Sequence, residues 1–578
     1  PSAIMVITTE EIRQSGATTI PDLLRSVPGV DVARTTASDV NVTARGLNGF
    51  TANRMQLLID GRLVSEELTG TLPWHQLPIS LEEIERIEIV KSPASALYGD
   101  RAFGGIVHII TKSPEALKGI SLSATGGDSG TALGSLIYAD VVGKLRYKVS
   151  IGYDRTNQFP NPLTGISSDQ EGRENFLGHF LISYQLGERS EVSLSGGINR
   201  FQVRDTPFEV SRSLGEGGLG FVKVNYRLAG FRAQYVFHRL DSQARGSDPI
   251  GGSTLADSHQ IELQHSVDVG ERNILTGGMS YRLNTFDSTV LLGVHRAQHL
   301  FGLFLQDEYS PFDNLTATVG VRIDTHPEAG LTVSPRGSLV YTPWDHHTFR
   351  ASIGSAFRNP TIFENFLLAE LPTGLPPPGP ATARIEGNRD LEPEELVSFE
   401  LGYQALLFKR FKARLDLFYS RFVRSIELEP VNPLGPPVLS FVDRDGGRIL
   451  GGEVGLEVLI AEGVRGFGNY SYQDRNGADP GVLGMVPRHK ANLGFHLSLK
   501  NGFSANLLLH YVGESHGASG RLGAYMLVNP RLAQRFKVLG HEVEAALQAF
   551  NLLNDVHREL PGGDLLERRV SGTLRFRF

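Results

Sequence analysis

Beyond residue 118 the chain alternates between apolar and polar side chains over most of its length. In the segment 145–153 the odd-numbered positions carry Leu, Tyr, Val, Ile and Tyr, and the even-numbered positions carry Arg, Lys, Ser and Gly. The segments 411–419 and 570–578 repeat this pattern. Successive side chains of a strand point to opposite faces, so strict alternation predicts strands with one apolar and one polar face.

Short and long connections alternate between these predicted strands, of which we count about 22, an even number. The tight turns lie at 187–189, 229–230, 270–272, 408–410 and 500–502. Most of the other connections are long and polar, up to the Pro-rich segment 360–390. Short turns at one end and long loops at the other are the layout of an outer-membrane β-barrel. A soluble β-sandwich has no reason to sort its loops in this way.

The first 114 residues follow a different pattern and predict a small α+β domain. Helical apolar spacing occurs at 10–15 and 20–26, the second with Thr19 as N-cap and Pro21 near the first helical position. Short apolar runs predict strands, among them one at 106–111. A barrel of this size has a lumen too wide for its own side chains to fill. We therefore predict that a domain at 1–114 plugs a transmembrane barrel at 115–578.

Composition and charge exclude several classes of function but do not identify one. The net charge of −7 over 578 residues gives no electrostatic case for a nucleic-acid partner. There is no cysteine, which excludes a disulfide framework and a thiolate metal site. The N-terminus lacks the basic start and apolar run of a signal peptide. His108 lies in an apolar run and is predicted to be a satisfied core histidine, and we predict no metal site and no cofactor.

Sequence motifs then indicate a family. The run 84–99 continues through Gly104 and Gly105 to residue 111 and is similar to the plug signature of TonB-dependent receptors. Barrel segments at 357–360, 388–394 and 551–555, with the final Phe578, are similar to that family too. The predicted plug-motif residues are Arg45, Gly46, Asp60, Gly61, Arg86, Lys91, Pro93, Tyr98, Gly99, Gly104 and Gly105. The motif glycines allow tight turns and close backbone approach.

The resemblance implies a monomeric receptor in the outer membrane of a Gram-negative bacterium, surrounded by outer-membrane lipid. It also implies active import of a scarce nutrient, energised by TonB and its inner-membrane complex through a Ton box. Pro1 begins at or after the point where that box should end, so we expect the box to be missing from this chain. Two positions depart from the family pattern: Lys91-Ser92-Pro93 replaces Arg-Gly-Pro, and His108 replaces Asn. The first departure puts in doubt any plug–barrel contact that needs a bidentate arginine.

The resemblance also suggests where cargo binds, since plug apices in this family hold substrate together with the inner barrel wall. Two segments, 47–54 and 65–76, are the predicted apices. The candidate substrate-binding residues are Asn48, Phe50, Asn53, Trp74 and His75, with Arg358 of the barrel. Trp74 is one of only two tryptophans.

Several cargoes and classes stay open at this point. A ferric siderophore is the first choice, and cobalamin or another metal complex is the second. The segment 361–387 contains no histidine, which counts against haem. A passive porin is a different class that the plug argues against. An outer-membrane enzyme needs an inward catalytic cluster, and the sequence shows none, so we predict that the chain is not an enzyme.

Overall fold

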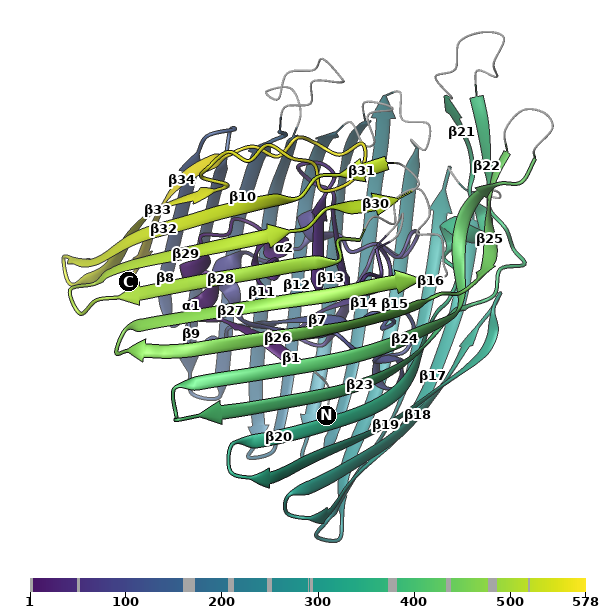
Figure 1. The fold of residues 1–578 in the computed structure, drawn as a ribbon, viewed down its shortest axis with the longest axis horizontal. Coiled ribbons are helices and arrows are strands. Elements are labelled where there is room, and N and C mark those ends of the chain that lie inside the picture. Colours follow the sequence, from purple (N-terminus) through teal and green to yellow (C-terminus); the bar gives the residue numbers. More distant parts are fainter. Residues whose placement is uncertain are drawn as a thin grey trace.

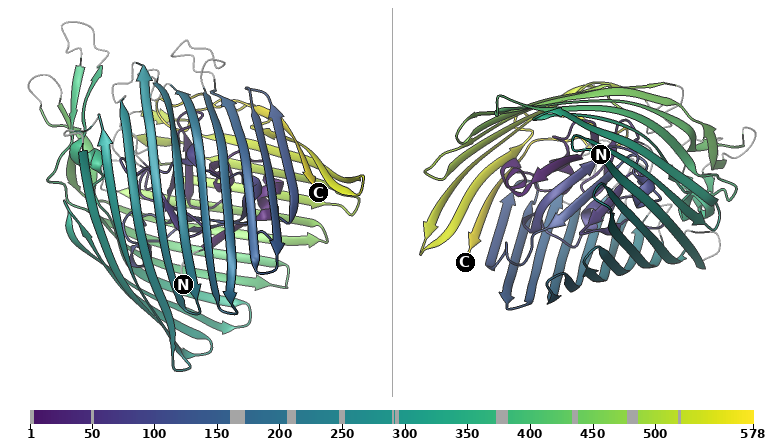
Figure 2. Two further views of the ribbon diagram at one scale, coloured as in Figure 1. Left: turned by 180° about the vertical axis from the view of Figure 1, so that it is seen from behind. Right: turned by 90° about the horizontal axis from the view of Figure 1, so that it is seen from below.

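The computed structural model describes residues 4–48, 52–159, 172–205, 213–246, 252–289, 291, 295–372, 382–432, 438–476, 486–517 and 520–578. Within them a small N-terminal domain lies inside a closed antiparallel barrel (Figure 1). Viewed from below, the N-terminal segment occupies the lumen (Figure 2, right). The predicted fold class is confirmed. Among the described residues, no helix is both long and apolar enough to cross a membrane.

The N-terminal domain is built on a five-stranded sheet with the order β1-β6-β7-β4-β5. Its strands are β1 (Ile4–Thr8), β2 (Val30–Arg34), β3 (Val40–Ala44), β4 (Gln56–Ile59), β5 (Arg62–Val64), β6 (Ile84–Val90) and β7 (Ile106–Thr111). Its helices are α1 (Thr9–Ser15), α2 (Ile20–Leu24), η1 (Trp74–Gln76), η2 (Leu81–Glu83) and α3 (Ser95–Tyr98). Thr19 caps α2 as predicted, with its hydroxyl accepting a hydrogen bond from the Asp22 amide. Buried aliphatic side chains from α1, α2 and the sheet form one core.

Within the described residues, 22 strands form the barrel wall, as predicted. They are β8 (Gly119–Gly127), β9 (Ala132–Val142), β10 (Leu145–Asn157), β11 (Gly172–Gly187), β12 (Ser190–Asp205), β13 (Ser213–Leu228), β14 (Phe231–Gly246), β15 (Ser253–Val269), β16 (Asn273–Ser288), β17 (His295–Phe312), β18 (Leu315–His326), β19 (Gly330–Trp344), β20 (His347–Arg358), β23 (Glu394–Leu407), β24 (Phe411–Pro430), β26 (Arg448–Ala461), β27 (Val464–Asn476), β28 (His489–Ser498), β29 (Phe503–Val512), β32 (Tyr525–Val538), β33 (His541–Phe550) and β34 (Arg569–Arg577). β34 pairs with β8 and closes the barrel. The predicted domain boundary after residue 114 stays a prediction, and the first wall strand begins at Gly119.

The alternation of the sequence becomes the two faces of this wall. Outward-facing Ile151, Val319 and Leu401 are 58%, 66% and 60% exposed, while the inward neighbours Ser150 and Glu400 are buried. An apolar outer face is what lipid requires of a closed barrel. The wall therefore presents its polar face to the plug.

Additional elements extend one end of the barrel, and those at 368–372, 382–386 and 438–445 appear at the upper right of Figure 1. They are α4 (Ile362–Phe366), β21 (Leu368–Pro372), β22 (Thr382–Glu386) and β25 (Val438–Asp445), with the small pair β30 (Ser515–Gly517) and β31 (Gly520–Leu522). The predicted tight turns lie at the opposite end, where connections such as the one between β13 and β14 span two residues. The tight turns thus lie at one end of the barrel and the longer connections at the other, as the loop lengths in the sequence predicted.

Candidate functional site

The two predicted apex segments of the plug are bonded to each other. The Asn53 side-chain amide donates to the Thr69 carbonyl at 3.0 Å. Within the second segment, the Gly70 amide donates to the Glu66 carbonyl at 2.7 Å and closes a turn. Burial raises the pKa of the Glu66 carboxyl, although Thr69 donates to that carboxylate. The apex is therefore a packed unit.

Helix α4, at the end of the barrel opposite the tight turns, packs directly on this apex. The Phe363 amide donates to the Leu68 carbonyl at 3.0 Å, and both side chains belong to one apolar cluster with Phe366. Thr361 and Glu364 form a capping box that begins α4. Glu67, next in the apex, pairs with Arg282 of the wall at 3.2 Å and with plug Arg101 at 3.4 Å. The apex thus joins plug, wall and outer segment.

The candidate substrate-binding residues fall into separate places. Asn48 is buried and accepts a hydrogen bond from the Asn41 side chain at 3.2 Å. Phe50 lies outside the described residues. Arg358 is 1% exposed and bonds Glu364 at 2.8 and 3.0 Å and Glu394 at 2.6 Å. Neither Asn48, Asn53 nor Arg358 lines the cavity that Trp74 and His75 share.

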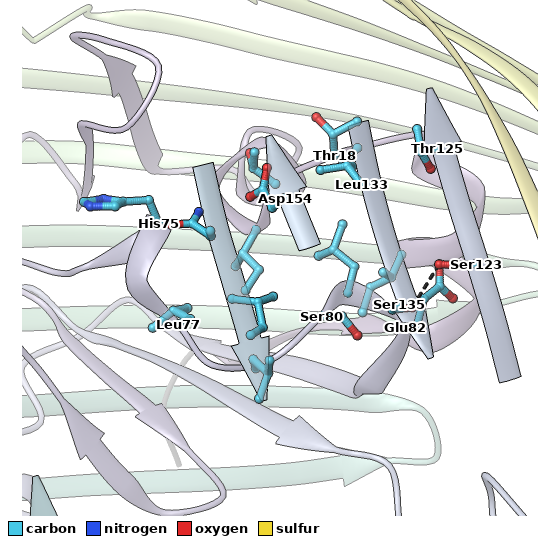
Figure 3. Close-up of a pocket in the computed structure, with 18 of the residues that line it drawn as sticks. Thr18, His75, Leu77, Ser80, Glu82, Ser123, Thr125, Leu133, Ser135 and Asp154 are labelled. Carbon is cyan, nitrogen blue, oxygen red and sulfur yellow. Dashed lines mark hydrogen bonds between the residues drawn. The ribbon is translucent and has the colours of Figure 1, made fainter. Parts of the chain in front are cut away.

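That cavity, of about 120 Å³, lies between the plug and the barrel wall (Figure 3). Its wall side comes from β8 to β11 and from β32 to β34, and its plug side comes from the segments around α1, η1 and η2. The lining mixes short polar side chains, as Figure 3 shows for Thr18, Ser80, Ser123, Thr125 and Ser135, with apolar ones such as Leu77 and Leu133. Ser123 and Ser135 are hydrogen-bonded across β8 and β9 at 2.9 Å.

Trp74 and His75 meet this cavity in different ways. The Trp74 side chain is 8% exposed, and its buried Nε1 has no hydrogen-bond partner. The His75 ring contacts Phe201 edge-on with centroids 5.7 Å apart. Burial lowers the pKa of His75 to about 3, and the nearby Arg173 guanidinium acts in the same direction. The imidazole is therefore neutral at neutral pH.

On another side, buried ion pairs fasten the plug to the wall. Arg45 bonds Glu400 at 2.6 Å and Glu453 at 3.1 Å. Lys91 pairs with the same Glu453 and donates to the Pro28 carbonyl at 2.8 Å. The lysine that departs from the family pattern thus makes a plug–barrel contact as a point charge, while Arg45 supplies the guanidinium.

A second buried cluster begins with Arg54, which bonds Glu394 through two nitrogen atoms at 2.6 and 3.0 Å. Glu394 also holds Arg358, and Arg358 holds Glu364 of α4. Sequence reasoning missed the glutamates Glu400 and Glu453, and it named Glu394 only as the end of the barrel motif 388–394. The only signal in the sequence was an acidic residue at a lumen-facing position of an alternating strand. Its partner in the plug lies hundreds of residues away in the chain, so the sequence could not show the pair.

The other plug-motif residues hold the plug together. Asp60 and Gly61 both have positive φ, 50° and 76°, in the turn between β4 and β5. The Asp60 carboxylate accepts from the Thr111 amide and hydroxyl, each at 2.8 Å. His108 is satisfied within the plug, where its Nε2 accepts from the Gly61 amide at 3.1 Å, but its side chain is 25% exposed and does not lie in the predicted core position.

The remaining motif positions lie on β6, in α3 or in the connections between elements. Arg86 is exposed on β6 and pairs with Glu88 at 2.7 Å. Tyr98 ends α3, and the Gly99 amide donates to the Ser95 carbonyl at 2.9 Å. The other members, Gly46, Pro93, Gly104 and Gly105, lie in connections, and Gly105 takes φ +139° where β7 begins. Among the residues with assigned structure, none of the His, Asp and Glu side chains form a group of three suited to a metal ion.

Comparison with known proteins decides the family. The model of the TonB-dependent receptor plug domain matches residues 1–106, and the model of the TonB-dependent receptor-like β-barrel matches residues 121–552. The chain belongs to the TonB-dependent receptor family. This confirms the resemblance that the plug and barrel motifs indicated.

Relatives of this receptor are receptors and transporters, in agreement with the prediction that it is not an enzyme. It is 24% identical over 416 residues to the vitamin B12 transporter BtuB of Vibrio vulnificus, a match that spans 69% of this chain and 64% of that protein. It is also 24% identical to the iron-regulated outer membrane virulence protein of Vibrio cholerae, covering 90% of this chain and 83% of that protein.

Solved structures share the whole fold. The siderophore receptor PirA of Pseudomonas aeruginosa superposes with a TM-score of 0.79 at 18% identity, covering 100% of this chain and 99% of that one. The ferric enterobactin receptor PfeA of the same species, in complex with enterobactin, gives a TM-score of 0.81 at 18% identity, with the same coverage. At this identity the likeness shows the fold alone.

Proposed function

We propose that this receptor imports a ferric siderophore across the outer membrane of a Gram-negative bacterium, energised by TonB and its inner-membrane complex. The observation that carries the proposal is the plugged lumen, fastened to the wall by the buried pairs of Arg45, Lys91 and Arg54. A passive porin needs an open lumen. Fold alone does not specify cargo, so the cargo rests on the named relatives.

Two of the proteins reported above, PirA and PfeA, are named as receptors for siderophores. PirA of Pseudomonas aeruginosa, reported above as a siderophore receptor, is also a sequence relative, 24% identical over 583 residues, and carries the name ferric enterobactin receptor. The second candidate is cobalamin, supported by the similarity to the vitamin B12 transporter. Both cargoes are large polar metal complexes that cannot cross a closed plug unaided.

The candidate substrate-binding residues divide into two groups with different proposed roles. Trp74 and His75 line the cavity between plug and wall, so we propose that they meet cargo below the apex. Asn48, Asn53 and Arg358 are engaged by neighbouring groups, and we propose that they shape the apex and the wall above it. An aromatic surface such as Trp74 suits a flat or aromatic chelate.

Growth on single nutrients tests the function. A strain whose only receptor for the tested nutrient is this one is supplied with ferric enterobactin, other ferric siderophores of defined type, or cyanocobalamin. We expect growth on at least one ferric siderophore, and no growth after deletion of either the receptor or TonB. Growth on cyanocobalamin alone selects the second cargo. Growth that is independent of TonB contradicts energised import.

A further inference from the structure

Two arginines lie opposite each other on the outer surface of the barrel wall. Arg421 of β24 and Arg448 of β26 are direct ladder partners, and both side chains are exposed. The adjacent ladder partners Ser420 and Ile449 are buried toward the lumen, so the alternation of the strands turns both arginines outward. Like charges directly opposite each other on a strand pair destabilise a sheet. An anion bound between these two side chains, which we call the arginine pair, would therefore stabilise the wall.

Within the part of the chain that the structure describes, no carboxylate balances this charge. Neither arginine forms an ion pair or a side-chain hydrogen bond there. Asp474, the ladder partner of Leu450 on β27, is bound by Arg488 at 3.0 Å. Glu392 is bound by Arg424 at 2.6 Å. The charge of the arginine pair is thus left for a partner outside the chain.

The arginine pair lies where the outer face changes from apolar to polar. On β24 the exposed Leu417 and Tyr419 precede Arg421 on this face. On β26 the exposed Leu450 is the next outward position after Arg448. Aromatic girdles mark the two edges of the apolar band of a membrane barrel, and the long loops are extracellular. Because both arginines lie on the side of this band away from the tight turns, they are at the headgroup level of the outer leaflet.

A hollow in the lipid-facing wall adjoins the arginine pair on the side of the tight turns. It has a volume of about 730 Å³ and extends over β18, β19, β20, β23, β24 and β26. Figure 1 shows the last four of these strands side by side at the front of the barrel. The outward side chains that line the hollow are apolar except for the hydroxyl of Tyr419: Ala317, Val319, Leu339, Ala351, Ile353, Phe399, Leu401, Leu417, Tyr419 and Leu450. The two residues next to the arginine pair, Tyr419 and Leu450, thus form one edge of the hollow.

We propose that this face binds one lipid of the outer leaflet whose headgroup carries a phosphate monoester. The phosphate lies between Arg421 and Arg448, and an acyl chain fills the hollow. A phosphate monoester carries a charge of about −1.5 to −2 at pH 7, and two guanidinium groups match it with charge-assisted hydrogen bonds. Arg421 is two residues beyond Tyr419, roughly 7 Å along the strand, so one lipid reaches both features. The inference is independent of the cargo and of energised import.

Another outward arginine provides a matched control. Arg155 of β10 follows the outward Tyr153, as Arg421 follows Tyr419, but its ladder partner on β11 is Glu174. An acid directly opposite balances the charge of Arg155 within the wall. The variants Arg421→Gln and Arg448→Gln are therefore compared with Arg155→Gln.

Two outward glycines provide a matched pair for the hollow. Gly337 of β19 lines it, and a Cβ added at Gly337 comes no closer than 3.8 Å to another residue. Gly220 of β13 lies elsewhere on the outer face and has the same clearance of 3.8 Å. Gly337→Leu therefore fills the hollow, and Gly220→Leu adds the same side chain without filling it.

Lipid binding is measured by native mass spectrometry on the receptor purified in a mild detergent. The probes are dipalmitoyl phosphatidic acid and dipalmitoylglycerol, which has the same acyl chains and no phosphate. We expect the receptor to bind phosphatidic acid about tenfold or more tightly than the diacylglycerol, because hydrogen bonds between charged groups are strong. Arg421→Gln, Arg448→Gln and Gly337→Leu should each weaken this binding about fivefold or more. Arg155→Gln and Gly220→Leu should leave it unchanged.

Heat-modifiable migration first shows that each variant is a folded barrel, and the arginine variants decide the outcome if Gly337→Leu does not fold. Equal affinity for the two lipids overturns the role of the phosphate. Equal effects of Arg421→Gln and Arg155→Gln overturn the arginine pair as its site. Displacement of phosphatidic acid by an equal concentration of inorganic phosphate overturns the lipid as the ligand, and receptor dimers in place of bound lipid assign the hollow to a second copy of the chain. None of these outcomes depends on the growth test, so the two proposals fail separately.

Discussion

Single buried charges decide how the plug is held at the residue scale. Glu453 is shared by Arg45 and Lys91, and all three side chains are nearly inaccessible to water. Removing one partner from such a group leaves the others charged and buried, at a cost of about 3–5 kcal/mol. The sequence could not reveal this contact, since Arg45 and Glu453 lie 408 positions apart.

Glu453→Ala is therefore expected to destabilise the plugged state by about 3–5 kcal/mol. The matched control is Glu457→Ala on the same strand, whose side chain is 55% exposed and pairs with Lys412 at 3.2 Å. An exposed pair of this kind contributes about 0–1 kcal/mol. For both variants, stability is measured as the urea concentration at which the plug loses its protection from protease. An equal effect of the two would show that the buried pair does not fasten the plug.

His75 supplies a pH dependence at the same scale. Its folded-state pKa, lowered to about 3 by burial, lies below the ordinary value of 6.5. As the pH falls, the His75 side chain therefore takes up a proton in the unfolded state before it does so in the folded state. The free energy of unfolding that neutral His75 contributes above about pH 6.5 is lost progressively toward pH 3. Between pH 7 and pH 4, the midpoint temperature of thermal unfolding should fall less steeply with decreasing pH for His75→Asn than for the parent. An unchanged slope would show that His75 is not held neutral.

At the scale of helices and strands, the sequence predicted the wall strands but not the additional elements at one end of the barrel. The wall strands followed from alternation, because one face of each meets lipid and the other meets the plug. α4, β21 and β22 were missed because they lie in the Pro-rich segment 360–390, and β25 because it directly follows a second stretch with several prolines, at 430–437. No periodic pattern in these stretches is long enough to show the elements. The cavity was also out of reach, since it depends on how plug and wall meet.

The short helix α4 gives the prediction at this scale. Thr361 caps it, and Glu364 both completes the capping box and pairs with Arg358. Thr361→Ala removes the cap, at a typical cost of about 1 kcal/mol, and should speed protease cleavage near residues 361–372. Thr348→Ala on β20 is the control, because its side chain caps no helix. If the two variants are cleaved at the same rate, the cap does not order the outer segment.

At the scale of the whole molecule, buried ion pairs hold the plug on more than one side. Arg45, Lys91 and Arg54 pair with the wall between β20 and β26, and Glu83 of the plug pairs with Lys148 of β10 and His179 of β11. A ligand biases such a plug only through its different affinities for the closed and open states. Import against a gradient therefore needs an external energy source, and the account assigns that role to TonB.

Accumulation of radioactive iron tests this central claim most directly. Cells that express the receptor receive the ferric siderophore selected by the growth test, in paired strains with and without TonB. The account predicts equal surface binding in both strains and accumulation inside the cell only in the strain with TonB. Equal accumulation in both strains would contradict energised import and assign the protein to passive channels.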